Sequence, residues 1–157
     1  MIKTGIGYDI HKLDIGRKLV IGGLEIPSKV GSIGHSDGDV LLHAIIDSIL
    51  GASSLGDIGK HFSSEDDKWK DANSMTFLED VAEKVKSTGF RINHIDSVII
   101  LQKPNLSEYI NKMRLNISNA IEIHRSQISI KATTTDRVGD IGKSNAIAAQ
   151  AITTLEN

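Results

Sequence analysis

The chain has 157 residues, of which 39% are hydrophobic and 24% charged, and its formal net charge is −2. These values are ordinary for one globular domain, and the charge gives no reason to expect nucleic acid or an anionic membrane as the main partner. No apolar run approaches the ~20 residues of a membrane span, and MIKTGIGYDI lacks the apolar core of a secretory signal. We therefore expect one domain, residues 1–157, that acts in the cytoplasm. Because cysteine is absent, any metal must be held by His, Asp and Glu.

The hydrophobic pattern predicts strands first, and then helices and strands in alternation. The first elements are a strand over 2–13 and a hairpin over 18–27 that turns at Gly22-Gly23. A largely apolar helix over 35–50 follows, opened by a capping box of Ser36 and Asp39. The next helix stops at Gly89 and carries on one face Phe77, Leu78, Val81, Ala82 and Val85. The later ones are a strand over 98–101, a helix capped by Ser107 with Ile110, Met113, Ile117 and Ile121 on its inner face, a strand over 127–132, and a last helix presenting Ala148, Ala151, Ile152 and Leu155. This alternation predicts one sheet covered by helices.

A polar stripe interrupts the apolar helix predicted over 35–50. Asp39, His43 and Asp47 recur every fourth residue, so they share one face of the helix. Buried carboxylates and imidazoles are costly unless they are paired, hydrogen-bonded or bound to a metal. The stripe therefore indicates a polar site within the core.

A metal centre is the first interpretation of this stripe. Asp9 and His11 lie two residues apart on the first strand, so their side chains leave the same face. With His43 they make three ligands, and three protein ligands with an open fourth position are typical of catalytic zinc. The spacing alone leaves two alternatives open: a surface Asp-x-His pair, and a hydrogen-bonded histidine in the core.

Two segments in the last part of the chain are candidates for phosphate binding. RVGDIGKS, residues 137–144, ends in Gly-Lys-Ser, but a P-loop requires glycine where this chain has Arg137, and we discount the motif. KATTTD, residues 131–136, ends a strand in hydroxyls and a carboxylate. Such groups can hold phosphate and a second divalent cation. The alternative is a β-prone run of threonines that ends in a turn.

Six motifs occur in the order GYDIH, IGGLEIP, HSDGDVLLHAIIDSILGASSLGDIGKHF, SVIILQKP, MR and IKATTTD. With them the sequence strongly resembles the family of the 2-C-methyl-D-erythritol 2,4-cyclodiphosphate synthases over essentially the whole chain. The resemblance implies an α/β (α+β) fold, namely a single mixed β-sheet with helices packed on one face, and a homotrimer with active sites between subunits. It also implies a phosphorus–oxygen lyase of the non-mevalonate isoprenoid pathway. In that reaction the 2-phosphate of 4-diphosphocytidyl-2-C-methyl-D-erythritol 2-phosphate attacks the β-phosphate, closing a cyclodiphosphate and releasing CMP.

The resemblance implies a zinc centre, one per subunit. Its ligands map to Asp9, His11 and His43, and a substrate phosphate oxygen would be the fourth ligand. Asp39 and Asp47 would support the ligands or stabilise the helix, since metal-bound histidine usually donates its other N–H to a carboxylate or carbonyl.

The resemblance also implies catalytic and substrate-binding residues. His35 and Thr134 would stabilise the transition state, and Asp136 would help to hold magnesium or manganese across the diphosphate. Cytosine would be enclosed by residues 101–107. The full substrate-binding set is Asp9, Ile10, His11, His35, Ser36, Asp57, Ile58, Gly59, Phe62, Ser63, Ser64, Glu65, Asp66, Leu101, Gln102, Lys103, Pro104, Asn105, Leu106, Ser107, Thr133, Thr134, Thr135, Asp136, Asp140 and Lys143.

The chain departs from the family pattern at four places. Asp136 stands for a usual Glu, FSSEDD for FPDTDP, and Lys103-Pro104-Asn105 for a common Pro-Lys. In GDIGKSNAI, where G-F-x-G-R-G-E-G-I is usual, Asp140 replaces an aromatic residue and Lys143 an Arg. Lysine lacks the bidentate grip of arginine. Both changes weigh against an isoprenoid diphosphate in the cavity on the trimer axis that family members often use.

Two other classes of function are alternatives. One is a zinc phosphohydrolase, which would use the same ligands to activate water. The other is a non-catalytic trimeric protein that binds metal or isoprenoid. The complete set of His35, Thr134 and Asp136 argues against a pure binder, because binding alone does not need groups matched to a transition state.

Overall fold

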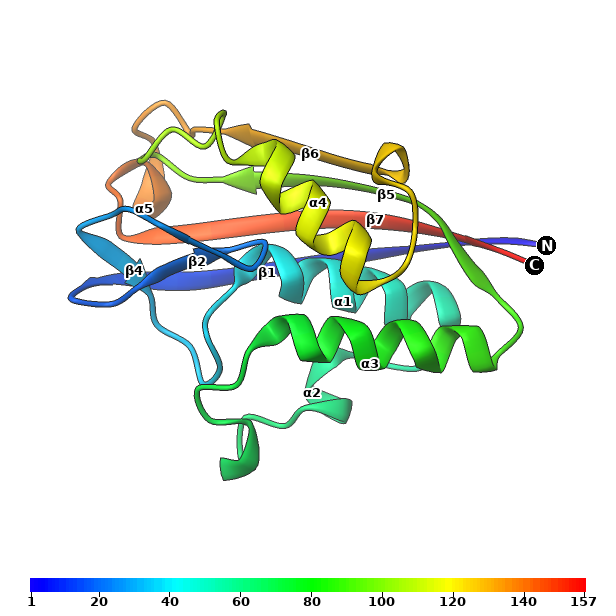
Figure 1. Cartoon of the computed structure of the whole chain (residues 1–157). Helices are drawn as coiled ribbons and strands as arrows, with labels where there is room; N and C mark the ends of the chain where they lie inside the picture. The colour runs from blue at the N-terminus through cyan, green and yellow to red at the C-terminus, as the bar shows by residue number, and fades with distance from the viewer.

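The computed structural model describes residues 1–157 and shows a mixed sheet with helices on one face (Figure 1). The strands are β1 (Ile2–Ile15), β2 (Leu19–Ile21), β3 (Leu24–Ile26), β4 (Val30–Ser32), β5 (Arg91–Ile100), β6 (Ile128–Thr133) and β7 (Ala146–Glu156). The helices are α1 (Val40–Ser53), α2 (Ile58–His61), α3 (Ser74–Ser87), α4 (Ile110–Ala120) and α5 (Gly139–Gly142), with short 3-10 helices η1 (Asp67–Trp69) and η2 (Arg125–Gln127). The predicted α/β class is confirmed.

The main sheet has five strands in the order β4-β1-β7-β5-β6. Strands β5 and β6 run parallel, and the other neighbours are antiparallel, so the sheet is mixed as predicted. Strands β2 and β3 form a separate two-stranded hairpin. Its turn falls at Gly22 and Gly23, both with positive φ, which confirms the predicted hairpin.

The last element is a strand, so the prediction of a final helix is wrong. β7 pairs with β1 along one edge and with β5 along the other. Its first four residues, Ala146–Ala149, are all buried, so the alternation expected of a strand is hidden there. Small side chains buried on both faces produce spacings that also fit one face of a helix, which explains the error.

Two predicted helix caps are also wrong. Asp39 is itself the N-cap of α1, where its side chain accepts the N–H of Leu42, so it does not form a capping box with Ser36. Helix α4 begins after Tyr109 without any side-chain cap, so Ser107 does not cap it. The predicted inner face of α4 is confirmed at Met113, Ile117 and Ile121, which are buried, while Ile110 is only partly buried.

Two glycines of β1 bring α1 unusually close to the sheet. A Cβ on Gly5 would lie 2.1 Å from the carbonyl oxygen of Ser48, and one on Gly7 would lie 2.0 Å from that of Ala44. The helix backbone can therefore approach the strand only because these positions have no side chain. Asp9 follows on the same face of β1, so the close approach places the middle of α1 above the strand's polar residues.

The opposite face of the sheet carries exposed apolar side chains. Ile6, Tyr8 and Ile10 alternate with the helix-facing residues of β1, and Ile152 adds to them from β7. Helix α1 packs on the other face, and α3 packs against α1 (Figure 1). None of the helices combines the length and the apolar character that a membrane crossing requires.

Candidate metal centre

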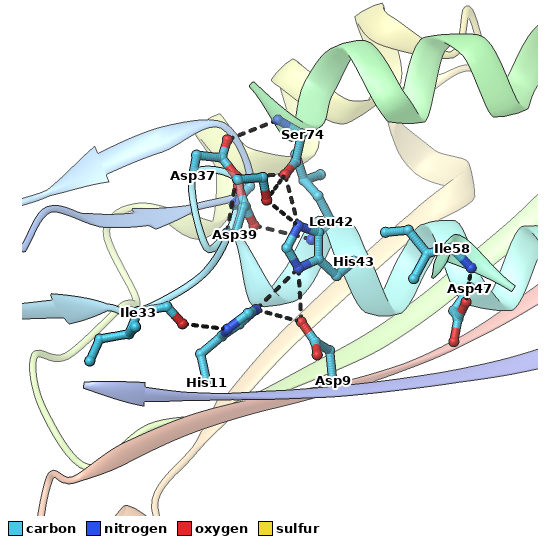
Figure 2. Close-up of polar contacts among 12 residues, drawn as sticks. Asp9, His11, Ile33, Asp37, Asp39, Leu42, His43, Asp47, Ile58 and Ser74 are labelled. Carbon is cyan, nitrogen blue, oxygen red and sulfur yellow. Dashed lines mark hydrogen bonds and ion pairs between the residues drawn. The ribbon is translucent and has the colours of Figure 1, made fainter. Parts of the chain in front are cut away.

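Asp9, His11 and His43 come together where α1 crosses β1, as the sequence predicted (Figure 2). The Asp9 Oδ2 atom lies 2.8 Å from His11 Nε2 and 2.9 Å from His43 Nδ1. The two imidazole nitrogens lie 3.1 Å apart. Bonds of about 2.0–2.1 Å to a tetrahedral ion would place such atoms roughly 3.3 Å apart, so small movements suffice to accommodate one.

The outer nitrogens of both imidazoles have other partners. His11 Nδ1 donates to the carbonyl of Ile33 at 2.8 Å, so Nε2 of the neutral ring is free to be a metal ligand, while a protonated ring donates from Nε2 to Asp9. His43 Nε2 lies 2.8 Å from Ser74 Oγ and 3.1 Å from Ser36 Oγ, on the side of the ring away from Asp9. The inner atoms are thus a carboxylate oxygen and two nitrogens that face one another. This donor set fits a divalent cation.

The electrostatics of the group also favour positive charge. Burial alone would raise the pKa of Asp9, but its hydrogen bonds with His11 and His43 outweigh burial and lower the pKa to about 2. Burial would lower the pKa of His11, but the hydrogen bond with Asp9 and the charge of that carboxylate raise it overall. The pair therefore stabilises an ionised carboxylate beside a cationic partner.

The two carboxylates of the polar stripe hold the segments around the metal group. Asp39 is fully buried and accepts the N–H groups of Gly22 at 3.0 Å and Gly23 at 2.8 Å; burial raises its pKa to about 6. Asp47 accepts the N–H of Ile58 at 2.8 Å, and burial raises its pKa. Asp39 does stabilise the helix, as expected. Neither carboxylate contacts the His43 ring, so the first of the two expected roles, support of the ligands, is not seen.

A hollow of about 230 Å³ opens beside the metal group. It is lined by His11, His35, Ser36, His43, Ile58, Gly59, Phe62, Ser64, Trp69 and Phe77. His35 Nε2 donates to the carbonyl of Asp66 at 3.1 Å. Phe62 stacks on Phe77 with ring centroids 4.3 Å apart, and Trp69 meets both rings edge-on.

Two aromatic residues of this hollow were missed as site residues. Phe77 was interpreted only as part of the apolar face of a helix, and Trp69 was not considered. Trp69 is the only tryptophan of the chain and sits in a polar segment, η1. That isolation was the one available signal, because a large aromatic in a polar loop usually packs against a site or a core.

A second hollow, of about 350 Å³, lies where the parallel strands β5 and β6 end. Its lining comprises Leu101, Gln102, Lys103, Pro104, Asn105, Leu106, Ala132, Thr133 and Thr134. Gln102 Oε1 accepts the N–H of Arg137 at 3.2 Å, which ties the two loops of this hollow together. Asp136 and Arg137 both have positive φ, 51° and 67°, a conformation that bends the chain sharply after Thr135.

The two hollows lie on different parts of the sheet. Thr134 and Asp136 follow β6, which is three strands from β1 in the order β1-β7-β5-β6. At about 4.8 Å per strand this is a separation of roughly 14 Å. Within one chain these residues are therefore not brought to Asp9 and His11.

The remaining predicted substrate residues take four positions. Asp57 caps α2, and Ser63, Glu65 and Asp66 lie between α2 and η1 near the first hollow. Asp140 and Lys143 lie at α5, and Thr135 and Ser107 lie near the second hollow in sequence. Ile10 alternates with Asp9 and His11, so its side chain points to the opposite, helix-free face of the sheet.

The mixed α/β sheet and the partly buried Asp–His–His group identify the chain as an α/β protein with a candidate divalent-metal centre. The chain belongs to the YgbB family, whose model matches residues 2–156. A protein of Alkaliphilus oremlandii named 2-C-methyl-D-erythritol 2,4-cyclodiphosphate synthase is 50% identical over 154 residues, 98% of each chain.

Two solved structures are similar over nearly the whole chain. One is the bifunctional IspDF from Campylobacter jejuni, with a TM-score of 0.95 and 39% identity; the match covers 99% of this chain and 42% of that longer one. The other is IspF of Plasmodium falciparum in complex with CDP, with a TM-score of 0.87 and 36% identity over 98% of this chain and 95% of that one.

Proposed function

We propose that the chain is a 2-C-methyl-D-erythritol 2,4-cyclodiphosphate synthase of non-mevalonate isoprenoid precursor biosynthesis. It converts 4-diphosphocytidyl-2-C-methyl-D-erythritol 2-phosphate to the 2,4-cyclodiphosphate and CMP, which makes it a phosphorus–oxygen lyase. The observation that carries this proposal is the complete group of Asp9, His11 and His43 in a member of the YgbB family. The relative that shares 50% of its residues bears the synthase name.

Asp9, His11 and His43 are proposed to hold zinc, and Asp136 to help hold magnesium or manganese. These cations supply charge neutralisation and polarisation of phosphoryl oxygen when bound. The donor set fits zinc because two imidazoles and one carboxylate leave an open position for a substrate oxygen. The residues themselves then have to position two phosphates, which demands orientation more than it demands a base.

Each hollow receives one end of the substrate in this proposal. Residues 101–107 enclose the cytosine, because Leu101–Leu106 line the second hollow, and the CDP complex of the Plasmodium falciparum IspF supports a cytidine diphosphate ligand. The hollow beside the metal group takes the methylerythritol phosphate, with the rings of Phe62 and Trp69 against its carbon atoms and His35 near its charge. Thr134 stabilises the transition state from the end of β6. Water is kept from the in-line position by a substrate held at both ends.

A homotrimer completes this site. In a single chain the metal group and Thr134 lie about three strands apart, so one chain supplies two half-sites rather than one whole site. The helix-free face of the sheet exposes Ile6, Tyr8 and Ile10, and a continuous apolar row of this kind favours association. We propose that this face packs against neighbouring subunits and joins the complementary half-sites. Asp140 and Lys143 weigh against an isoprenoid diphosphate on the axis.

Product analysis tests the proposed function. Incubation of the zinc-loaded protein with the substrate and Mg²⁺ should release CMP and one cyclodiphosphate in equal amounts. A zinc phosphohydrolase would instead produce inorganic phosphate or an open-chain phosphate, and a binding protein would produce neither. Chromatography of the nucleotide together with ³¹P NMR of the phosphorus products distinguishes the three outcomes.

A further inference from the structure

A buried serine contacts the metal-ligating imidazole from behind. Ser74, the first residue of α3, is fully buried, and its Oγ lies 2.8 Å from His43 Nε2 (Figure 2). The same oxygen lies 2.5 Å from Asp37 Oδ1. Ser74 therefore stands between a carboxylate and the nitrogen of His43 that faces away from Asp9.

The direction of these hydrogen bonds follows from the donors available. Asp37 accepts the N–H of Ser74 at Oδ2, 2.9 Å away, and the N–H of Asp39 at Oδ1, 3.1 Å away. Both oxygens of the Asp37 carboxylate thus act as acceptors, and a carboxylate has no proton to give. The hydroxyl of Ser74 must therefore donate to Asp37. Because a hydroxyl carries one proton, Ser74 can only accept from His43 Nε2.

A proton on Nε2 decides which nitrogen of His43 faces the metal. In a neutral imidazole the other nitrogen, Nδ1, then carries the lone pair. This is the nitrogen that lies 2.9 Å from Asp9 Oδ2 and 3.1 Å from His11 Nε2. The opposite tautomer would place an N–H at the metal position and abolish the ligand.

We propose that Asp37 and Ser74 are positioning residues that fix His43 as the Nε2–H tautomer and thereby set the metal affinity of the centre. This inference rests on the metal centre of the proposed function and deepens it. Ser36 Oγ, 3.1 Å from the same nitrogen, is a second and longer contact. The contact of His43 Nε2 with Ser74 is shorter than its contact with Ser36, and only Ser74 donates in turn to a carboxylate, that of Asp37. Ser74 therefore provides most of the orientation of the ring.

Zinc affinity measured without substrate tests the role directly. Partners of this kind typically contribute about 10–100-fold to metal affinity. Ser74→Ala should weaken zinc binding by that order in competition with a chromogenic chelator. Ser87→Ala is the matched control, since Ser87 lies on the same helix and its hydroxyl donates only to the carbonyl of Lys84. The control should bind zinc like the unmodified chain.

A double-variant cycle shows whether Asp37 acts through Ser74. As a single substitution, Asp37→Asn should weaken zinc binding, because the amide replaces one acceptor by a donor. If Asp37 acts through Ser74, Asp37→Asn should reduce zinc affinity little further in a chain that already carries Ser74→Ala. A purely structural role for Asp37 would give additive losses instead, and that result would overturn the relay.

The tautomer itself is visible in the ¹⁵N shifts of the His43 ring. Without metal, Nδ1 can also donate to Asp9, so the two chains are compared: the unmodified chain should show a larger fraction of the Nε2–H tautomer than Ser74→Ala does. Unchanged zinc affinity in Ser74→Ala, or unchanged tautomer fractions of His43 in Ser74→Ala and Asp37→Asn, would refute the proposal. These measurements use no substrate, so a chain that makes no cyclodiphosphate yet shows the zinc loss would refute the function and retain the positioning role.

Discussion

Replacement of Gly7 by alanine tests how the metal centre is assembled. The added Cβ would lie 2.0 Å from the carbonyl oxygen of Ala44 and 2.7 Å from the amide nitrogen of Ser48. Real Cβ contacts essentially never fall below 3.0 Å, so α1 and β1 must separate by about 1 Å at this point. Both clashing atoms belong to backbone, so no side-chain rotation relieves them.

The separation should reduce both stability and metal affinity. Overpacking of a well-packed core costs about 1–3 kcal/mol, and we expect the upper end because two backbones are forced apart. His43 precedes Ala44 on the displaced helix, so its Nδ1 should move by a similar distance from Asp9 and His11. A metal site tolerates changes of roughly 0.2 Å in its bond lengths. Zinc affinity should therefore fall on the order of 100-fold or more.

Gly51→Ala is the matched control for Gly7→Ala. Gly51 lies on α1 and faces the same strand, but its Cβ would lie 3.8 Å from the carbonyl oxygen of Ile6, an ordinary contact. Alanine is favoured over glycine inside a helix by about 0.5–1 kcal/mol, so this variant should be more stable. Urea unfolding of the metal-free chains and zinc titration measure both effects. A Gly7→Ala chain with the stability and zinc affinity of the unmodified chain would refute the close-approach argument.

Three further predictions concern the metal, the buried carboxylate and assembly. Metal analysis should find about one zinc per unmodified chain and none in His43→Ala, because two ligands do not hold the ion. Burial raises the pKa of Asp39 from 3.8 to about 6, so its stabilising contribution is present below pH 4 and is lost as the pH rises through 6. This decrease in the free energy of unfolding, up to about 3 kcal/mol, should be absent when the unfolding of Asp39→Asn is measured as a function of pH. Sedimentation should show a trimer for the unmodified chain and a monomer for Ile6→Asp, since a charge on the helix-free face opposes association.

Each of these three predictions has a contradicting result. Stoichiometric zinc in His43→Ala would exclude the Asp9–His11–His43 centre. Identical pH profiles of unfolding for Asp39→Asn and the unmodified chain would show that Asp39 titrates normally in the native state. A fully active monomer, with or without Ile6→Asp, would refute the shared active site.

Local periodicity indicated the metal group, and the resemblance to the synthase family selected it. Asp9 and His11 are two apart on a strand, and a two-residue period fixes them on one face whatever the rest of the fold. His43 lies among apolar neighbours on a helix that must face the sheet. These two patterns still allowed a surface pair or a core histidine, and the structure brings the three side chains together.

The partners of the polar stripe depend on tertiary contacts, which local sequence patterns do not predict. Asp39, His43 and Asp47 share one face, as predicted, but four residues span about 6 Å along a helix. Each therefore meets a different segment: the β2–β3 turn, Ser74 and the start of α2. Ser74 is 31 residues from His43, and no spacing rule connects them. The same limit applies to β7, whose central place in the sheet buries its alanines and hides its period.

CMP release from a substrate that lacks the 2-phosphate tests the central claim most directly. Oriented intramolecular attack can be worth about 7–11 kcal/mol over a bimolecular equivalent, so no other nucleophile should compete with the 2-phosphate. The complete substrate should therefore give CMP and cyclodiphosphate in equal amounts, and 4-diphosphocytidyl-2-C-methyl-D-erythritol should give no CMP. CMP from both compounds, or inorganic phosphate as a main product, would mean that water is the nucleophile and would contradict the synthase.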